Sequence, residues 1–272
     1  MTNTYNLTKL NEAVELGTTL TRSWFRGHAK AFRELTPGIF RPTYTNEIYA
    51  AYRPNVEFSI IEGFKRKAPA LASKLPQNDD HVAWLFLMQH HGVPTRLLDW
   101  TKNVLVGLYF AVEKHPSEDG ELWALYPEEL NRHNGYFGLP IPRCKILNYL
   151  ASEPSHNNPQ KLAEEFGLKE IPKYPHAVDP PLHFSRMVTQ MSTFTIHPRP
   201  IRGHTIPEIM KEEEHFVRYI IPSDCKRKIL SDLAALGITR MTLFPNLDSL
   251  SHDIVREHNI VAYSPPKPPK WE

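Results

Sequence analysis

The first residues whose types suggest a chemical role surround Arg26. Residues 22–41 contain five basic residues and one acidic residue, a local net charge of +4, interleaved with aromatic side chains. A guanidinium can bind phosphate oxygens in a fork geometry, aromatic rings stack on bases, and Gly27 permits close backbone approach to a ligand. The segment therefore favours a ligand with both a phosphate and a base. The alternative is a surface strand whose arginines pair with nearby acids.

A second group of polar side chains lies in residues 89–101, Gln-His-His-Gly-Val-Pro-Thr-Arg-Leu-Leu-Asp-Trp-Thr. Adjacent histidines point to different faces of a helix, so His90 and His91 lack the spacing of a metal site, and we expect no metal. One of them could meet the ligand as a hydrogen-bond donor or general base. The alternative is a helix C-terminus, where histidine is favoured beside the negative end of the dipole.

Further polar candidates follow along the chain. Arg96 and Asp99 lie between two largely apolar segments, so we expect an Arg96–Asp99 salt bridge, or Asp99 as the cap of the next helix. Thr95 is a small hydroxyl residue after a proline and could line a pocket. Gln190 lies four residues after Arg186 and just before an expected strand, where it can hydrogen-bond to a loop or face a ligand.

The composition excludes several classes of protein. With 272 residues, 41% of them hydrophobic, and 32 Lys+Arg against 30 Asp+Glu, the chain is neither disordered throughout nor basic enough to bind nucleic acid by net charge alone. It has no run of about 18 apolar residues to span a membrane, and residues 1–20 are polar, unlike a secretory signal. Cys144 and Cys225 alone make no disulfide framework, so a cytoplasmic protein with reduced thiols is expected.

The apolar spacing predicts an α+β fold, one mixed domain over residues 20–260 in which central buried helices pack on a small, mainly antiparallel sheet. The predicted helices include 55–67, one capped by Asp80, 103–113 capped by Thr101 or Asp99, 226–236 and 248–258. The predicted strands include 22–28, 121–126, 194–197, 214–221 and 239–244. Many of the 25 prolines lie in 127–200, which indicates an irregular insertion at about 127–184, and others mark residues 261–272 as an extended tail.

Four motifs can be compared with known families. They are Phe25-Arg26-Gly27, the segment 89–101 followed by Tyr109-Phe110-Ala111, Arg186 with Gln190 and Phe194, and Leu236-Gly-Ile to Leu243-Phe-Pro-Asn-Leu-Asp248. With these motifs the chain resembles the FRG domain family over residues 22–258. One departure is Ser192, where a glycine is expected. The family name implies a domain without a particular reaction, and FRG-like chains resemble mobile bacterial or phage-associated proteins, which implies a toxin or defence role.

The order of the candidate residues also resembles ADP-ribosyltransferase folds. There an Arg or His on the first strand grips NAD, a middle strand gives a hydroxyl or aromatic group, and a late Glu or Gln orients the acceptor or ribose. The resemblance implies NAD as the ligand, with Arg26 or His28 on its pyrophosphate or ribose and Trp100 or Tyr109 on its nicotinamide. Gln190 would replace the usual acid, which implies a non-protein acceptor or a lost activity.

Two other functions remain open: a non-enzymatic module that binds a nucleotide or nucleic acid, and a phosphodiester hydrolase that uses the His90–His91 pair. The candidate catalytic residues are Arg26, His90, His91 and Gln190. The candidate ligand-binding residues are Phe25, Arg26, Gly27, His28, Thr95, Arg96 and Tyr109. Convergence of Arg26, one of the two histidines and Gln190 in one cleft would favour an enzyme, whereas Arg26 on an open basic surface would favour a binding module.

Overall fold

The computed structural model describes residues 3–31, 35–41, 52–139, 144–155, 158–181, 185–200 and 203–258. The strands within these ranges are β1 (Asn3–Asn6), β2 (Trp24–His28), β3 (Leu97–Thr101), β4 (Gly120–Leu125), β5 (His176–Val178), β6 (Ser192–Ile196) and β7 (Val217–Ile221). The α-helices are α1 (Leu10–Thr19), α3 (Pro54–Lys67), α4 (His81–His90), α5 (Val104–Val112), α6 (Pro127–Arg132), α7 (Lys145–Ser152), α8 (Pro159–Glu165), α9 (Ser185–Thr189), α10 (Ile206–Ile209), α11 (Ser223–Ala235), α12 (Arg240–Leu243) and α13 (Leu247–Glu257). The described residues also form three short 3-10 helices, η1 (Gly38–Phe40), η2 (Ala68–Ala70) and η3 (Glu153–Ser155).

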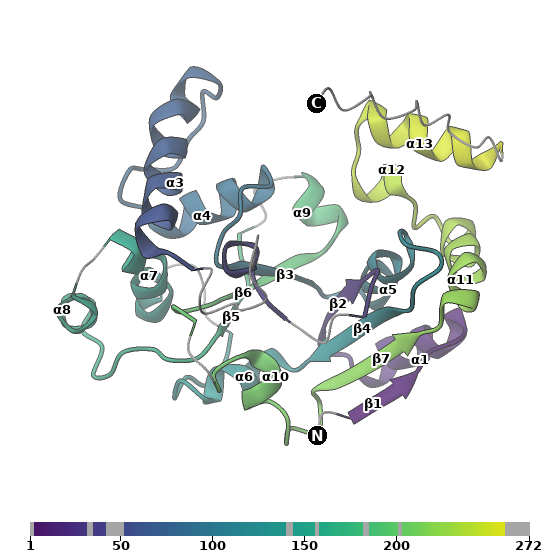
Figure 1. Ribbon diagram of the computed structural model, residues 1–272, viewed down its shortest axis with the longest axis horizontal. Helices are drawn as coiled ribbons and strands as arrows, with labels where there is room; N and C mark the ends of the chain where they lie inside the picture. Colours follow the sequence, from purple (N-terminus) through teal and green to yellow (C-terminus); the bar gives the residue numbers. More distant parts are fainter. Residues whose placement is uncertain are drawn as a thin grey trace, which may run out of the picture.

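The strands form one sheet, which in the described part of the chain has seven members in the order β1-β7-β4-β2-β3-β6-β5 (Figure 1). β1 pairs with β7 in parallel, and the other neighbouring strands pair antiparallel. Helices pack against this mainly antiparallel sheet, so the α+β prediction is confirmed.

The centre of the sheet is irregular. β2 pairs with β4 along its whole length, but with β3 only at Phe25 and Thr101. β3 in turn pairs with β6 along its whole length. Beyond the Phe25–Thr101 pair, β2 and β3 therefore diverge, and the sheet opens between them.

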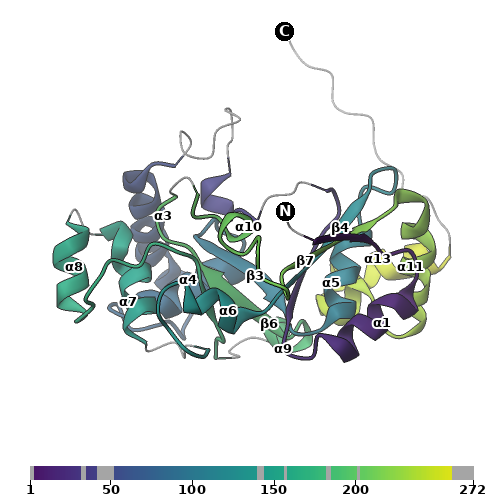
Figure 2. The same cartoon turned by 90° about the horizontal axis from the view of Figure 1, so that it is seen from below.

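Two groups of helices cover the two halves of the sheet. α1, α5 and α11 gather beside β4 and β7, whereas α3, α4, α7 and α8 gather at the end that holds β5 and β6 (Figures 1 and 2). Each group has its own hydrophobic core, because apolar residues of the helices pack with those of the neighbouring strands. A third cluster, which includes Trp24 of β2, Leu98 of β3 and Trp123 of β4, joins the two halves through the strands that flank the opening between β2 and β3.

Gly27 is explained by the packing of α5 against β2. A Cβ atom at Gly27 would lie 1.9 Å from the carbonyl oxygen of Gly107 and 2.6 Å from the backbone nitrogen of Ala111. Because both atoms belong to the backbone of α5, a side chain cannot be accommodated by a change of rotamer. The glycine of the Phe25–Gly27 motif thus permits close approach of a helix, in addition to lining the cleft described below.

Several local predictions are confirmed and others are wrong. The helix predicted at 55–67 is α3, and Asp80 caps α4 by accepting a hydrogen bond from the backbone of Ala83. α5 is capped by Asn103 and not by Thr101 or Asp99. The strand predicted at 239–244 is wrong, because Thr239 and Thr242 exchange the hydrogen bonds of a capping box and start α12.

Other parts of the fold were not predicted or are not tested by the structure. β1 and α1 were not predicted. α6, α7, α8 and β5 lie in the proline-rich region, whose status as an insertion stays a prediction. The predicted tail, 261–272, lies outside the described residues. Among the residues that the structure does describe, no helix is both long and apolar enough to cross a membrane.

Candidate ligand-binding cleft

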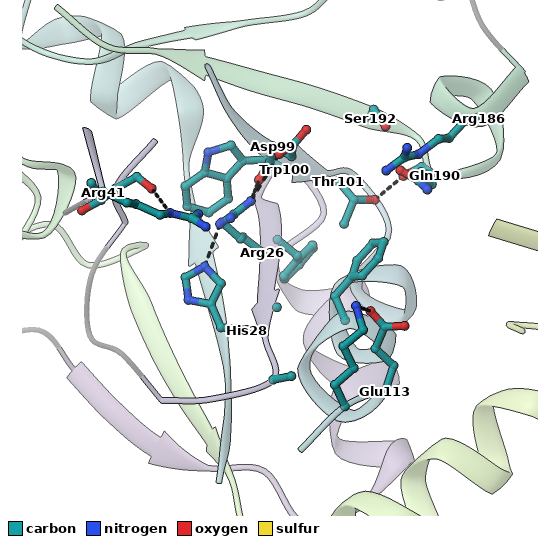
Figure 3. A pocket seen from close by; sticks show the side chains of 16 residues that line it. Arg26, His28, Arg41, Asp99, Trp100, Thr101, Glu113, Arg186, Gln190 and Ser192 are labelled. Carbon is teal, nitrogen blue, oxygen red and sulfur yellow. Dashed lines mark hydrogen bonds and ion pairs between the residues drawn. The ribbon is translucent and has the colours of Figure 1, made fainter. Parts of the chain in front are cut away.

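A cleft of about 830 Å³ opens where β2 and β3 diverge (Figure 3). Its walls come from β2, β3, the end of α5, the residues from α9 to the start of β6, and residues Thr36 and Arg41. Pockets that bind small molecules usually have volumes of ~300–1,000 Å³, so the cleft is large enough for a nucleotide.

Arg26 of β2 bridges the opening at the base of this cleft. Its Nε donates a hydrogen bond to Nε2 of His28 at 2.8 Å, and its Nη1 donates one to the carbonyl oxygen of Asp99 at 2.6 Å. The second bond spans the diverging strands where a backbone pair is missing. Nη2 makes no hydrogen bond with the described residues, which leaves this nitrogen for a ligand.

The charge of Arg26 is only partly compensated. Burial lowers its pKa to about 10; the charge of Asp99 opposes this shift and that of Arg41 adds to it. At neutral pH the guanidinium still carries its proton. The guanidinium has lost part of its hydration on folding, and the protein provides only part of the compensating negative charge. An anion bound beside Nη2 would therefore stabilise the charge of Arg26.

His28 holds Arg26 in this orientation. Its Nε2 accepts from Arg26, so its proton is on Nδ1, which donates to Glu121 at 2.8 Å. Arg218 donates to the other carboxylate oxygen of Glu121 at 2.7 Å. Burial, reinforced by the charge of Arg26, lowers the pKa of His28 to about 4, so His28 is neutral at pH 7. With both ring nitrogens engaged, His28 serves to position Arg26.

Glu121 supplies the negative charge of this network. Burial acts to raise its pKa, but its hydrogen bonds, that from His28 the strongest of them, outweigh burial and lower the pKa. The carboxylate therefore stays ionised at neutral pH and fixes the Nδ1–H tautomer of His28.

The buried histidines predict an acid-sensitive fold. His28 takes up a proton near pH 6.5 in the unfolded chain but only near pH 4 in the folded one. Its contribution to stability is therefore complete above pH 6.5 and is lost as the pH falls towards 4, by up to about 3 kcal/mol. Urea unfolding at pH 4–7 should show this loss, with a shallower slope in His28→Asn. His176 and His197, with pKa values lowered to about 3 by burial, keep part of the slope in both proteins. Equal slopes in the two proteins would contradict the assignment.

The cleft as a whole is positively charged. Its charged side chains are Arg26, Arg41, Lys114, Arg186, Asp99 and Glu113, with a net charge of +2. Arg41 is oriented by a 3.1 Å hydrogen bond from its Nε to the carbonyl oxygen of Thr36. Arg186 lies over the ring of Phe244 at 4.4 Å. These cations are gathered around one concave site, which suits an anionic small molecule.

Asp99 is fixed beside Arg26 by residues of the central motif. Its Oδ2 accepts a 2.8 Å hydrogen bond from Gln89 and lies 3.8 Å from Nη1 of Arg26. The hydroxyl of Thr95 donates to Oε1 of Gln89 at 2.7 Å, which sets the orientation of that amide. Thr95 is thus buried away from the cleft, where it acts on Asp99 through Gln89.

Arg96 forms buried ion pairs that stabilise the fold, away from the cleft. It is 0% exposed and pairs at 2.5 Å with Glu57 of α3 and with Glu153 of η3. The predicted Arg96–Asp99 salt bridge is therefore wrong. Residues an odd number apart on an extended chain point to opposite faces, so the two side chains diverge. Arg96 does not line the cleft but joins elements of the α3 half of the molecule.

The remaining candidates divide between the cleft and its surroundings. Gln190 lines the cleft; its Nε2 donates to the carbonyl oxygen of Leu243 at 3.0 Å, and its Oε1 has no hydrogen bond among the described residues. Tyr109 is buried in the core around α5, and the rings of His90 and His91 pack against each other at the end of α4. None of these three rings lines the cleft.

The candidate residues are therefore brought together in part. Those that line the cleft are Phe25, Arg26, Gly27, His28 and Gln190, and Trp100 lines it too. Glu121, which the sequence analysis did not single out, completes the Arg26 network. Glu121 could have been recognised as a candidate because it lies within a strand that is buried along its whole length, and a buried carboxylate needs a hydrogen-bonding or charged partner.

Comparison with protein families decides what this part of the chain is. The model of the FRG domain matches residues 21–120. The chain contains an FRG domain. The match includes Arg26, His28, Asp99 and Glu113, so most of the charged cleft lies in the FRG domain, while Arg186 and Gln190 come from beyond its matched residues. Comparisons with curated proteins and with solved structures gave no match.

Proposed function

We propose that the cleft of the FRG domain binds a nucleotide through its phosphate groups, that this nucleotide is NAD, and that the domain transfers its ADP-ribosyl group. The observation that carries the proposal is Arg26, a largely buried guanidinium with incomplete charge compensation and one nitrogen left for a ligand. Arg41, which also lines the cleft, adds a second donor for the phosphates.

The neighbouring strands support NAD in particular. Arg26 comes from β2, Trp100 and Thr101 from β3, and Gln190 from the residues just before β6, and these three strands are adjacent in the sheet. The resemblance to ADP-ribosyltransferase folds implies the same order of residue types along the chain, a cation, then a hydroxyl or aromatic group, then a Glu or Gln, although the cation lies here on the second strand and not on the first. The volume and net charge of the cleft suit a dinucleotide with two phosphates.

The carboxylates of the cleft suit the chemistry of this transfer. In the reaction the bond between ribose C1′ and the nicotinamide nitrogen breaks, and nicotinamide leaves as a neutral molecule with the bonding electrons. A lone pair of the acceptor then bonds to C1′, and the acceptor releases its proton. The leaving group needs no general acid, whereas the positive charge that develops on the ribose would be stabilised by a nearby carboxylate. We assign this role to Asp99, whose carboxylate lies beside Arg26 in the cleft.

A binding module without turnover is the second candidate. It is favoured by the lack of a general base at His28, whose ring nitrogens are both hydrogen-bonded, and by the position of His90 and His91 outside the residues that line the cleft. Because His90 and His91 do not line the cleft, a phosphodiester hydrolase that uses this pair is disfavoured.

Release of nicotinamide from NAD tests the proposal. The wild type should release nicotinamide, and Asp99→Asn should lower the rate about 100-fold while NAD affinity changes less than about 3-fold, because the lost charge acts mainly on the transition state. Asp179→Asn, in the exposed pair with Lys102, is the control. NAD binding without nicotinamide release would favour the binding module. Absence of both binding and release would contradict the NAD proposal.

A further inference from the structure

A second incompletely compensated cation lies in the cleft. Arg186 of α9 stacks on Phe244 at 4.4 Å and makes no ion pair with the residues that the structure describes. Burial lowers its pKa, and the charge of Asp99 only partly opposes this shift. Like Arg26, this guanidinium would gain from a bound anion.

The surroundings of Arg186 complete a small polar site. Gln190 and Ser192 line the cleft beside it, and Figure 3 shows these three side chains on one side of Thr101, with Arg26, His28 and Arg41 on the other. The hydroxyl of Thr101 donates to the carbonyl oxygen of Gln190 at 2.7 Å, which fixes the turn before β6. A guanidinium next to a hydroxyl is a suitable donor set for a phosphate.

The backbone between Gln190 and Ser192 is held in an uncommon conformation. Met191 has φ of 46°, in the left-handed region that non-glycine residues rarely adopt. The backbone nitrogen of Lys102 donates to the carbonyl oxygen of Met191 at 3.1 Å and stabilises this turn. Strained residues that persist in a fold commonly lie at binding sites, and here the turn places both flanking side chains in the cleft.

The charge of Asp99 acts on the arginines of both groups of donors. Its carboxylate is 56% exposed, lies 3.8 Å from Arg26, and contributes to the electrostatic environment of Arg186. A continuous polyphosphate that ran from Arg26 to Arg186 would pass this carboxylate and be repelled. The arrangement instead suits two separate anionic groups with an uncharged part between them.

We propose that the cleft contains two anion subsites, one at Arg26 with Arg41 and one at Arg186 with Ser192, and that the second takes a phosphate group separate from the pyrophosphate of the nucleotide. The identity of the first ligand rests on the proposed function. The second phosphate is either the ribose 2′-phosphate that distinguishes NADP from NAD or a phosphate of a separate acceptor molecule.

Calorimetric titration with NAD and NADP distinguishes these sources. If the second phosphate is on the dinucleotide, the wild type should bind NADP at least about 10-fold more tightly than NAD, and Arg186→Gln should bring this ratio to about 1. If it is on an acceptor, the two affinities should be equal, and inorganic phosphate should bind to the NAD-saturated wild type but not to NAD-saturated Arg186→Gln. Lys102→Gln, which removes an exposed cation paired with Asp179, is the matched control. A lack of dependence on Arg186 in both titrations would overturn the inference.

A titration with inorganic phosphate alone separates this inference from the NAD proposal. Phosphorus NMR should show phosphate binding that is weakened in Arg26→Gln, weakened in Arg186→Gln, and lost in the double variant, whether or not NAD binds. If Arg26→Gln alone abolishes phosphate binding, or if Arg186→Gln leaves it unchanged, the cleft has a single anion subsite and the inference is wrong.

Discussion

Gly27→Ala should destabilise the protein by about 3 kcal/mol or more, the largest effect on stability that we expect from adding one methyl group. The new Cβ would lie 1.9 Å from Gly107 O and 2.6 Å from Ala111 N, both in the backbone of α5. To relieve this overlap, α5 must move away from β2, which disrupts the core formed by α1, α5 and α11. Urea unfolding measures the change.

Gly63→Ala is the matched control for this substitution. Gly63 lies in α3, and a Cβ atom there would meet nothing within 4 Å. Alanine is more favourable than glycine in the interior of a helix, so the free energy of unfolding of this variant should rise by up to about 1 kcal/mol. A loss of less than about 1 kcal/mol in Gly27→Ala would show that the helix and strand are not packed as tightly as described.

Arg26→Gln should weaken nucleotide binding about 100-fold while changing the free energy of unfolding by less than about 1 kcal/mol. Loss of a charge-assisted hydrogen bond to a phosphate in a desolvated site costs about 1.5–3 kcal/mol, and each 1.4 kcal/mol is a factor of ten in affinity. Stability changes little because two effects oppose each other. The variant loses the hydrogen bonds to His28 and to the carbonyl oxygen of Asp99, but it also removes a largely buried charge whose pKa is lowered.

This separation of affinity from stability distinguishes a ligand-binding residue from a structural one. A structural role for Arg26 would make the variant unstable, because its hydrogen bond to Asp99 joins the two diverging strands. The buried Arg96 illustrates that case, since it compensates two carboxylates and has no access to the cleft.

Local patterns predicted much of the fold because their causes are local. Asp80 caps a helix through a residue three positions away, and the apolar faces of α5 make it a buried central helix. Local patterns misled where the same residues serve two purposes. Threonine is common in strands, but here the hydroxyls of Thr239 and Thr242 cap a short helix.

The partners of charged residues were the part that sequence could not supply. Arg96 pairs with Glu57 and Glu153, which are 39 and 57 residues away, whereas spacing suggested Asp99. The role of His28 likewise depends on Glu121, 93 residues farther along the chain. Arg26 and Gln190 were predicted as site residues because a guanidinium in a basic aromatic segment and a polar residue before a strand can be recognised without their partners.

Calorimetric titration of NAD into the wild type, Arg26→Gln and Arg22→Gln tests most directly whether Arg26 is the anion anchor of this cleft. Arg22 lies four residues before Arg26, but its side chain is 63% exposed and pairs with Glu128 at the surface. The wild type and Arg22→Gln should bind with equal affinity, and Arg26→Gln should bind about 100-fold more weakly. Equal affinities in all three proteins, or no binding by the wild type, would contradict the account.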